Sequence, residues 1–227
     1  MSERSNVTGT SPRSGSTKSI VDAYDSLAVK LYSLIRFRIV RPRILQEVGQ
    51  YLPREGRALE VGCGFGLFGL HFALSNPELH ILGFDIDAHR IGLADEAKRR
   101  LGVDNIEFSV GDAREAMLGS DLDAIYMFDV IHHIPPPSAF DLMKRSYEAL
   151  GPDGVLLVKD VDTRPRLKTA FTWLLDVLMT KGERPTYWSS NDLIATLEGL
   201  GFSVRRHTMV DSLPYPHVLL VASKHSA

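Results

Sequence analysis

Three glycines spaced two residues apart, Gly62, Gly64 and Gly66, directly follow a short apolar stretch, Ala58–Val61. Glycine adopts positive φ readily and lets a ligand approach the backbone closely. The apolar stretch is predicted to be a strand, and the residues after the loop, about Leu67–Leu74, a helix. This order is typical of sites for nucleotide-like ligands, although an ordinary tight turn has the same local pattern.

Short apolar stretches alternate with helical segments along the rest of the chain, which predicts an α/β fold with a mostly parallel sheet. A Pro-rich loop too short for a crossover helix joins the last two strands, so we expect them to pair antiparallel. The predicted fold is a doubly wound, Rossmann-like, seven-stranded sheet, mostly parallel with an antiparallel C-terminal strand. Its strands are predicted at Ala58–Val61, His80–Phe84, Ile106–Val110, Ala124–Phe128, Val155–Lys159, Phe202–Met209 and His217–Ala222.

Polar residues follow several of these strands. Asp85 ends the second strand, Asp112 comes shortly after the third, and Asp129–His133 follows the fourth. Ligands of such sheets bind outside the carboxyl ends of the strands, where the strand order reverses. We therefore expect these residues and the glycine loop to share one rim.

The glycine loop fits two kinds of cofactor. Gly64, Gly66 and Gly69 satisfy G-x-G-x-x-G, and Asp85 lies where a carboxylate could bind both ribose hydroxyls. Glu60 precedes the loop, where a carboxylate would repel a diphosphate but attract a sulfonium and an ammonium group. The sequence thus favours S-adenosylmethionine and keeps an NAD-dependent oxidoreductase as the alternative.

Several segments together resemble class I S-adenosylmethionine-dependent methyltransferases, in style nearest to the ubiquinone/menaquinone-type small-molecule enzymes. The resemblance covers about residues 20–160 and the terminal strands. It does not extend to the 162–188 segment, so the acceptor cannot be carried over. The matching segments are Leu59–Gly66 (motif I), Phe84–Asp87 (acidic motif II), Gly111–Ala113, Asp123–Ile134 (motif IV), Leu150–Leu156 and Tyr24–Asp25.

The resemblance implies a set of cofactor-binding residues. It assigns the adenine amino group to Asp112, which could instead cap a turn, and suggests that Tyr24 closes over the cofactor. Cys63 is interpreted as a small packing residue rather than a nucleophile. The predicted set is Tyr24, Glu60, Gly62, Cys63, Gly64, Gly66, Asp85, Ile86, Asp112, Ala113 and Asp129.

His132 and His133 are the candidate catalytic residues, because they follow the fourth strand where the methyl acceptor must approach. A histidine there could remove the acceptor's proton, or both could merely pack the rim. Together with Asp129 they could also hold a metal, but we predict none. A binding module that keeps the cofactor and lacks transfer activity is the third hypothesis.

We expect one methyltransferase domain at residues 19–227, after a disordered tail at 1–18. A helical cover at 19–52 and a lid at 162–188 would enclose the acceptor. Leu27–Leu45 and Arg166–Lys181 are amphipathic and basic. They are interpreted as cover and lid, or alternatively as a surface that contacts membrane or lipid. An apolar lid suits a small hydrophobic acceptor that is polyketide-, quinone- or lipid-like.

Composition excludes several other classes. The net charge of −2 gives no basic field for nucleic acid, so no nucleic-acid partner is expected. Cys63 is the single cysteine, which rules out a disulfide framework within the chain. No apolar run is long enough to span a bilayer, and no signal peptide is evident. The expected location is cytoplasmic, with membrane association as the alternative.

Overall fold

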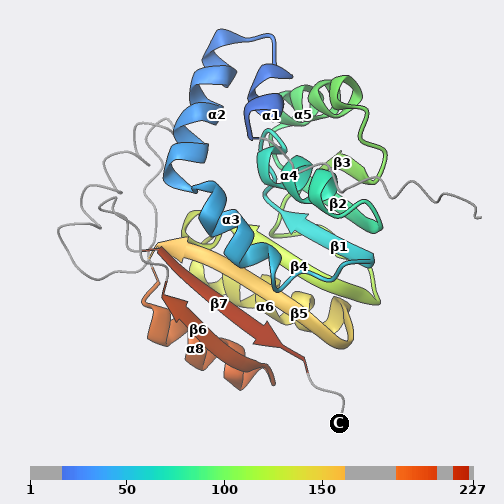
Figure 1. Ribbon diagram of the computed structural model, residues 1–227. Coiled ribbons are helices and arrows are strands. Elements are labelled where there is room, and N and C mark those ends of the chain that lie inside the picture. The colour runs from blue at the N-terminus through green and yellow to red at the C-terminus, as the bar shows by residue number, and fades with distance from the viewer. Residues whose placement is uncertain (1–16, 162–187, 209–216, 225–227) are drawn as a thin grey trace, which may run out of the picture.

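The computed structural model describes residues 17–161, 188–208 and 217–224. Figure 1 shows one sheet with helices on both of its faces. The strands of the described part are β1 (Gly56–Val61), β2 (Leu79–Asp85), β3 (Ile106–Val110), β4 (Leu122–Phe128), β5 (Leu150–Val161), β6 (Ser203–Thr208) and β7 (His217–Ser223). The helices there are α1 (Thr17–Asp22), α2 (Leu27–Ile39), α3 (Pro42–Gly49), α4 (Leu67–Ser75), α5 (Ala88–Leu101), α6 (Pro136–Ala149) and α8 (Ser190–Gly199), with a 3-10 turn at Ile131–His133.

The strand order is β3-β2-β1-β4-β5-β7-β6. All pairs from β3 to β5 are parallel, whereas β7 pairs antiparallel with both β5 and β6. This confirms the predicted seven-stranded, mostly parallel sheet with an antiparallel C-terminal strand. The order reverses between β1 and β4, so the switch point lies directly after these two strands, where ligands of such sheets bind.

The sheet separates two hydrophobic clusters. Side chains from α1 to α5 form the cluster on one face, and side chains from α6 and α8 form the cluster on the other. Strand β4 contributes to both, because successive side chains of a strand point to opposite faces. Tyr126 and Phe128 belong to the first cluster, and Ile125 and Met127 to the second.

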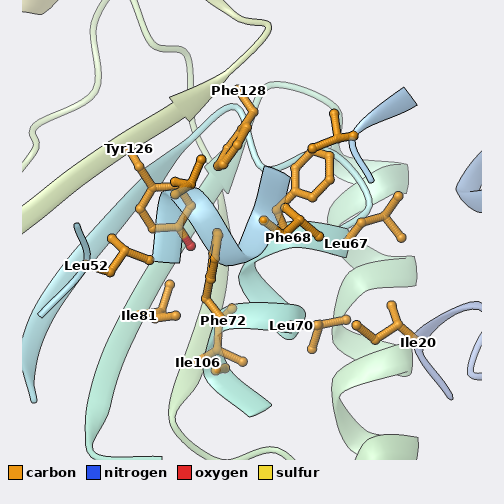
Figure 2. Close-up of a cluster of buried hydrophobic side chains, with 14 of the residues drawn as sticks. Ile20, Leu52, Leu67, Phe68, Leu70, Phe72, Ile81, Ile106, Tyr126 and Phe128 are labelled. Atoms are coloured by element: carbon orange, nitrogen blue, oxygen red, sulfur yellow. The ribbon is translucent and has the colours of Figure 1, made fainter. Parts of the chain in front are cut away.

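Aromatic rings from α4 and β4 lie close together among the aliphatic side chains of the first cluster, as Figure 2 shows for Phe68, Phe72, Tyr126 and Phe128. The Phe68 and Phe128 ring centroids are 4.8 Å apart, and those of Phe72 and Tyr126 are 5.5 Å apart in an edge-to-face arrangement. Such packing fixes α4 against β4, and α4 begins at the glycine loop. The packing of α4 on β4 therefore also holds the glycine loop in place.

The N-terminal segment, predicted as a helical stretch from about Ile20 to Tyr51 that Pro42 breaks or kinks, forms three short helices. Ser26 starts α2, because its side chain accepts a hydrogen bond from the Val29 amide. Pro42 occupies the first turn of α3, as its missing N–H allows. In Figure 1, α2 lies on the side of the sheet where β1 and β5 end, at the carboxyl ends of the parallel strands.

Strand β5 starts at Leu150, five residues earlier than predicted, because the expected turn at Gly151–Gly154 is part of a bulged strand. The predicted tail and lid lie almost wholly outside the described residues. Within the described ranges, no helix has both the length and the apolar character needed to cross a bilayer.

Candidate functional site

The glycine loop is held by backbone hydrogen bonds from both sides. The Cys63 amide donates to the Phe84 carbonyl at 2.9 Å, and the Gly66 amide closes a turn on the Cys63 carbonyl at 2.8 Å. Gly62, Gly64 and Gly66 all have positive φ, at 70°, 55° and 76°. This backbone course is costly for any residue with a Cβ, which explains the spacing of the three glycines.

The three glycines face different surroundings. A Cβ on Gly62 would lie 2.6 Å from Val130, and one on Gly66 would lie 2.6 Å from Phe108. A Cβ on Gly64 would meet only Asp85, at an ordinary 3.9 Å. Gly62 and Gly66 therefore let the loop pack against the protein, while the Gly64 side is open toward Asp85.

Asp85 braces the loop from the end of β2. One carboxylate oxygen accepts the Gly64 amide at 2.8 Å, and the other accepts the Asp87 amide at 3.0 Å. Beside it, two apolar side chains are exposed: Ile86 at 63% and Val110, the register partner of Asp85, at 58%. A carboxylate flanked by exposed aliphatic groups suits a ribose with a flat base attached.

The loop after β3 completes this end of the rim. Its Asp112 carboxylate accepts from the Arg114 amide and guanidinium, and Arg114 holds the pKa of Asp112 below its usual range. Arg145 from α6 donates to the carbonyls of Ala113, at 2.7 Å, and Ala116, at 2.5 Å. Sequence analysis did not single out Arg145, which fixes the loop at a point where Asp112 can face a ligand.

Glu60 does not lie on the rim. Its side chain is buried, hydrogen-bonded to the Gly69 backbone and 3.5 Å from the Tyr126 hydroxyl. Burial raises its pKa to about 8. Gly69 has room for no side chain, because a Cβ there would collide with the Glu60 carboxyl. Gly69, the last glycine of G-x-G-x-x-G, thus leaves space for the Glu60 carboxyl. Direct contact of Glu60 with a ligand's charged end stays a prediction.

Two other residues predicted to bind the cofactor are Tyr24, which contacts the loop, and Cys63, which belongs to it. The buried Tyr24 donates its hydroxyl to the Phe65 carbonyl at 2.6 Å, which ties the N-terminal segment to the loop. Cys63 is buried, and desolvation raises the pKa of its thiol. It therefore remains a neutral thiol at physiological pH, in keeping with a packing role.

Asp129 joins three elements at the end of β4. One of its oxygens is 2.5 Å from the Lys159 ammonium of β5, and the other is 3.0 Å from the Arg36 guanidinium of α2. Lys159 is buried, and desolvation lowers its pKa against the opposing effect of Asp129. Asp129 has φ of 56°, which is uncommon for a residue other than glycine. Its partners Arg36 and Lys159 were not among the predicted site residues.

His132 and His133 follow Asp129 with their ring centroids 4.1 Å apart, but their surroundings differ. His132 is buried, and its Nδ1 lies 2.6 Å from a carboxylate oxygen of the buried Asp160. His133 is exposed at the surface, yet desolvation and the adjacent His132 lower its pKa to about 4. Sequence analysis missed Asp160, which lies near the end of β5 on the same rim.

The geometry therefore divides the rim into two parts. The glycine loop, Asp85 and Asp112 offer an open side, exposed aliphatic groups and carboxylate acceptors, which fit an adenosine ligand. His132 lies in the second part, and Val130 joins the parts because it packs against Gly62.

Comparison with known proteins identifies the family. The family described as "Methyltransferase domain" matches residues 32–207, well over half of the chain. The chain belongs to the class I S-adenosylmethionine-dependent methyltransferases. The N,N-dimethyltransferase OxyT of Streptomyces rimosus is 31% identical over 161 residues, which are 70% of this chain and 46% of that protein.

Solved methyltransferases share the fold. The S-adenosylmethionine-dependent methyltransferase SibL has a TM-score of 0.71 at 19% identity, over 91% of this chain and 61% of that chain. Magnesium protoporphyrin IX methyltransferase from Synechocystis PCC 6803, solved with bound SAH, has a TM-score of 0.65 at 21% identity, over 83% and 85%.

Family membership decides between the cofactors left open above. The methyltransferase uses S-adenosylmethionine, and the NAD-dependent oxidoreductase is set aside. The chain spans only about half the length of the first curated relatives that it matches, 46% and 53%. The acceptor is therefore not identified by these relatives.

Proposed function

We propose that this methyltransferase methylates a small hydrophobic acceptor at an oxygen or nitrogen that carries a proton, with His132 as the general base. The observation that carries this proposal is the buried 2.6 Å contact between His132 and Asp160. The polyketide-, quinone- or lipid-like classes remain the candidate acceptors. The names of OxyT and of the magnesium protoporphyrin IX enzyme support a small molecule.

The proposed roles on the cofactor side follow the open part of the rim. The three loop glycines form the cradle, Asp85 accepts hydrogen bonds from the ribose, and Ile86 packs on the base. Asp112 and the backbone at Ala113 take the adenine edge. The cofactor supplies a methyl group on a sulfonium, which needs little activation beyond correct placement. Asp129, bound to Arg36 and Lys159, is assigned a supporting role beside it.

On the acceptor side, Asp160 would hold the His132 ring through the Nδ1 proton, and Nε2 would take up the acceptor's proton. The acceptor's lone pair then forms the bond to the methyl carbon as the carbon–sulfur bond breaks, and the electron pair stays on sulfur. Desolvation lowers the pKa of His133 to about 4, which makes it a weak base near neutral pH. Because His132 is buried, the acceptor must shed water to reach it, which favours an apolar molecule.

Transfer of radiolabelled methyl from S-adenosylmethionine to a panel of small phenols, quinols and amines tests the proposal. We expect His132→Asn to lower turnover at least about 100-fold, the usual contribution of a general base, and His133→Asn to change it little. Asp160→Asn should also lower turnover, because the His132 ring loses the carboxylate that holds it in place.

Cofactor affinity, measured by calorimetry, is the control and should stay within a few-fold of wild type in all three variants. Equal turnover of His132→Asn and wild type would refute the base. Absence of label in any acceptor, together with tight cofactor binding, would instead favour the binding module without transfer activity.

A further inference from the structure

Helix α2 carries a row of exposed apolar side chains on its outer face. The row consists of Leu27, Leu31, Leu34 and Ile35, with exposed fractions of 81%, 57%, 56% and 43%. At about 100° per residue these positions fall within an arc of roughly 100° on the helix surface. We call these four residues the outer row. Isolated exposed apolar residues are common, but four on one helical stripe require an explanation.

The opposite face of α2 accounts for the attachment of the helix to the fold. Val29 and Phe37 are buried in the first hydrophobic cluster, and the Tyr32 ring packs on Phe65 at 5.0 Å. Arg36 reaches Asp129 at the rim. Within the part of the chain that the structure describes, the outer row belongs to neither hydrophobic cluster nor the candidate site, so the described fold does not account for its exposure.

The charge around the outer row has one sign. Lys30 borders the row, and the exposed Arg38 continues it one turn later, while the sequence contains no acidic residue between Asp25 and Glu47. Both of these flanking acids already have cationic partners: Asp25 pairs with Arg100, and Glu47 pairs with Arg43. An apolar stripe bordered by cations complements a surface that is apolar within and anionic outside.

We propose that the outer row of α2 docks on the surface of an anionic lipid bilayer. Leu27, Leu31, Leu34 and Ile35 would enter the acyl boundary, and Lys30 and Arg38 would lie among the headgroups. A second copy of the chain fits less well, because two such helices facing each other would bring cations together without a carboxylate between them. Since the inner face of α2 contacts the rim through Arg36, docking places the acceptor side of the site next to the bilayer.

Vesicle flotation with the full chain tests the docking directly. We expect wild-type protein to float with phosphatidylcholine vesicles that contain phosphatidylglycerol, and much less with phosphatidylcholine alone. The double variant Leu31→Gln/Leu34→Gln keeps helix propensity but should lower the partition coefficient about tenfold or more. Lys30→Gln/Arg38→Gln should remove the preference for anionic vesicles and make binding insensitive to salt.

Phe140→Gln is the matched control, because Phe140 is also an exposed helical residue, at 47%, but lies on α6 against the opposite face of the sheet. It should float like wild type. Wild-type protein that binds neither kind of vesicle would overturn the proposal. A dimer in light scattering that Leu31→Gln/Leu34→Gln converts to monomer would instead assign the row to a second copy. Flotation does not depend on methyl transfer, so it can fail or succeed independently of the proposed base.

Discussion

Gly62 and Gly64 belong to the same loop, but the reasons for glycine differ between the two positions. Gly62 is required by Val130, whose side chain occupies the space a Cβ would need, and by its φ of 70°. Gly64 has no such neighbour, and a Cβ there would meet only Asp85 at an ordinary 3.9 Å, although its φ of 55° also favours glycine. Packing requires the first glycine, whereas only the backbone conformation favours the second, although their spacing in the sequence is uniform.

Gly62→Ala should lower the free energy of unfolding by about 1–3 kcal/mol, because it adds both a clash and a strained φ. Urea denaturation of the variant measures this loss. Gly92→Ala is the control, since Gly92 lies inside α5 and a Cβ added there would meet nothing within 4 Å. That change should stabilise the protein by about 0.5–1 kcal/mol. Equal stability of the two variants would contradict the assignment.

Some site residues were predictable because their signal is local. Asp85 ends β2 and Asp112 lies two residues after β3, and these positions at the carboxyl ends of parallel strands place them on the rim. Asp160 also lies near the carboxyl end of a strand. Its pairing with His132, which is 28 residues away in the sequence, depends on β4 and β5 being neighbours in the sheet. The burial of Glu60 was not predictable, because a strand buried on both faces shows no alternation that would reveal which way each side chain points.

At the scale of elements, the N-terminal helices are fastened to the cofactor side at three points. Tyr24 binds the loop carbonyl of Phe65, Asp25 pairs with Arg100 of α5, and α2 is joined to β4 through Asp129. Strand positions were predicted well because each strand is an apolar run between turn residues. The break between α2 and α3 was predicted from Pro42, whereas the break between α1 and α2 was not, because it depends on the Ser26 cap and on these tertiary contacts.

Tyr24→Phe removes one of these points and should weaken S-adenosylmethionine binding about 3- to 10-fold, the effect of one hydrogen bond of about 0.5–1.5 kcal/mol. The loop carbonyl of Phe65 loses its buried donor, so the loop is held less firmly. Calorimetry measures the change. Tyr32→Phe is the matched control, because the Tyr32 ring rather than its hydroxyl contacts Phe65. Identical affinities for both variants would show that the tie to the loop is not needed for binding.

At the scale of the whole molecule, stability should depend on pH through Glu60. Its pKa rises from 4.5 to about 8 on burial, so the folded state holds its proton over a pH range in which the unfolded state has lost it. As far as Glu60 is concerned, the free energy of unfolding is therefore highest below about pH 4.5 and falls as the pH rises to about 8. Within this window the slope approaches about 1.4 kcal/mol per pH unit.

Glu60→Gln should remove this slope, because the amide does not titrate. Urea unfolding of both proteins at several pH values gives the difference in their free energies. We expect the variant to gain on wild type steadily between about pH 5 and 8 and to show a constant difference above that range. Parallel curves over the whole range would show that Glu60 is already ionised in the folded protein.

The position of β7 between β5 and β6 has a consequence for biosynthesis. The ribosome makes β6 before β7, so β6 has no neighbour to pair with until residues 217–223 have emerged. Until then β5 also presents an unpaired edge, and unpaired edges invite association with other chains. The sheet can be completed only after residues 217–223 have been made, and a chain stopped before residue 217 would expose both edges permanently.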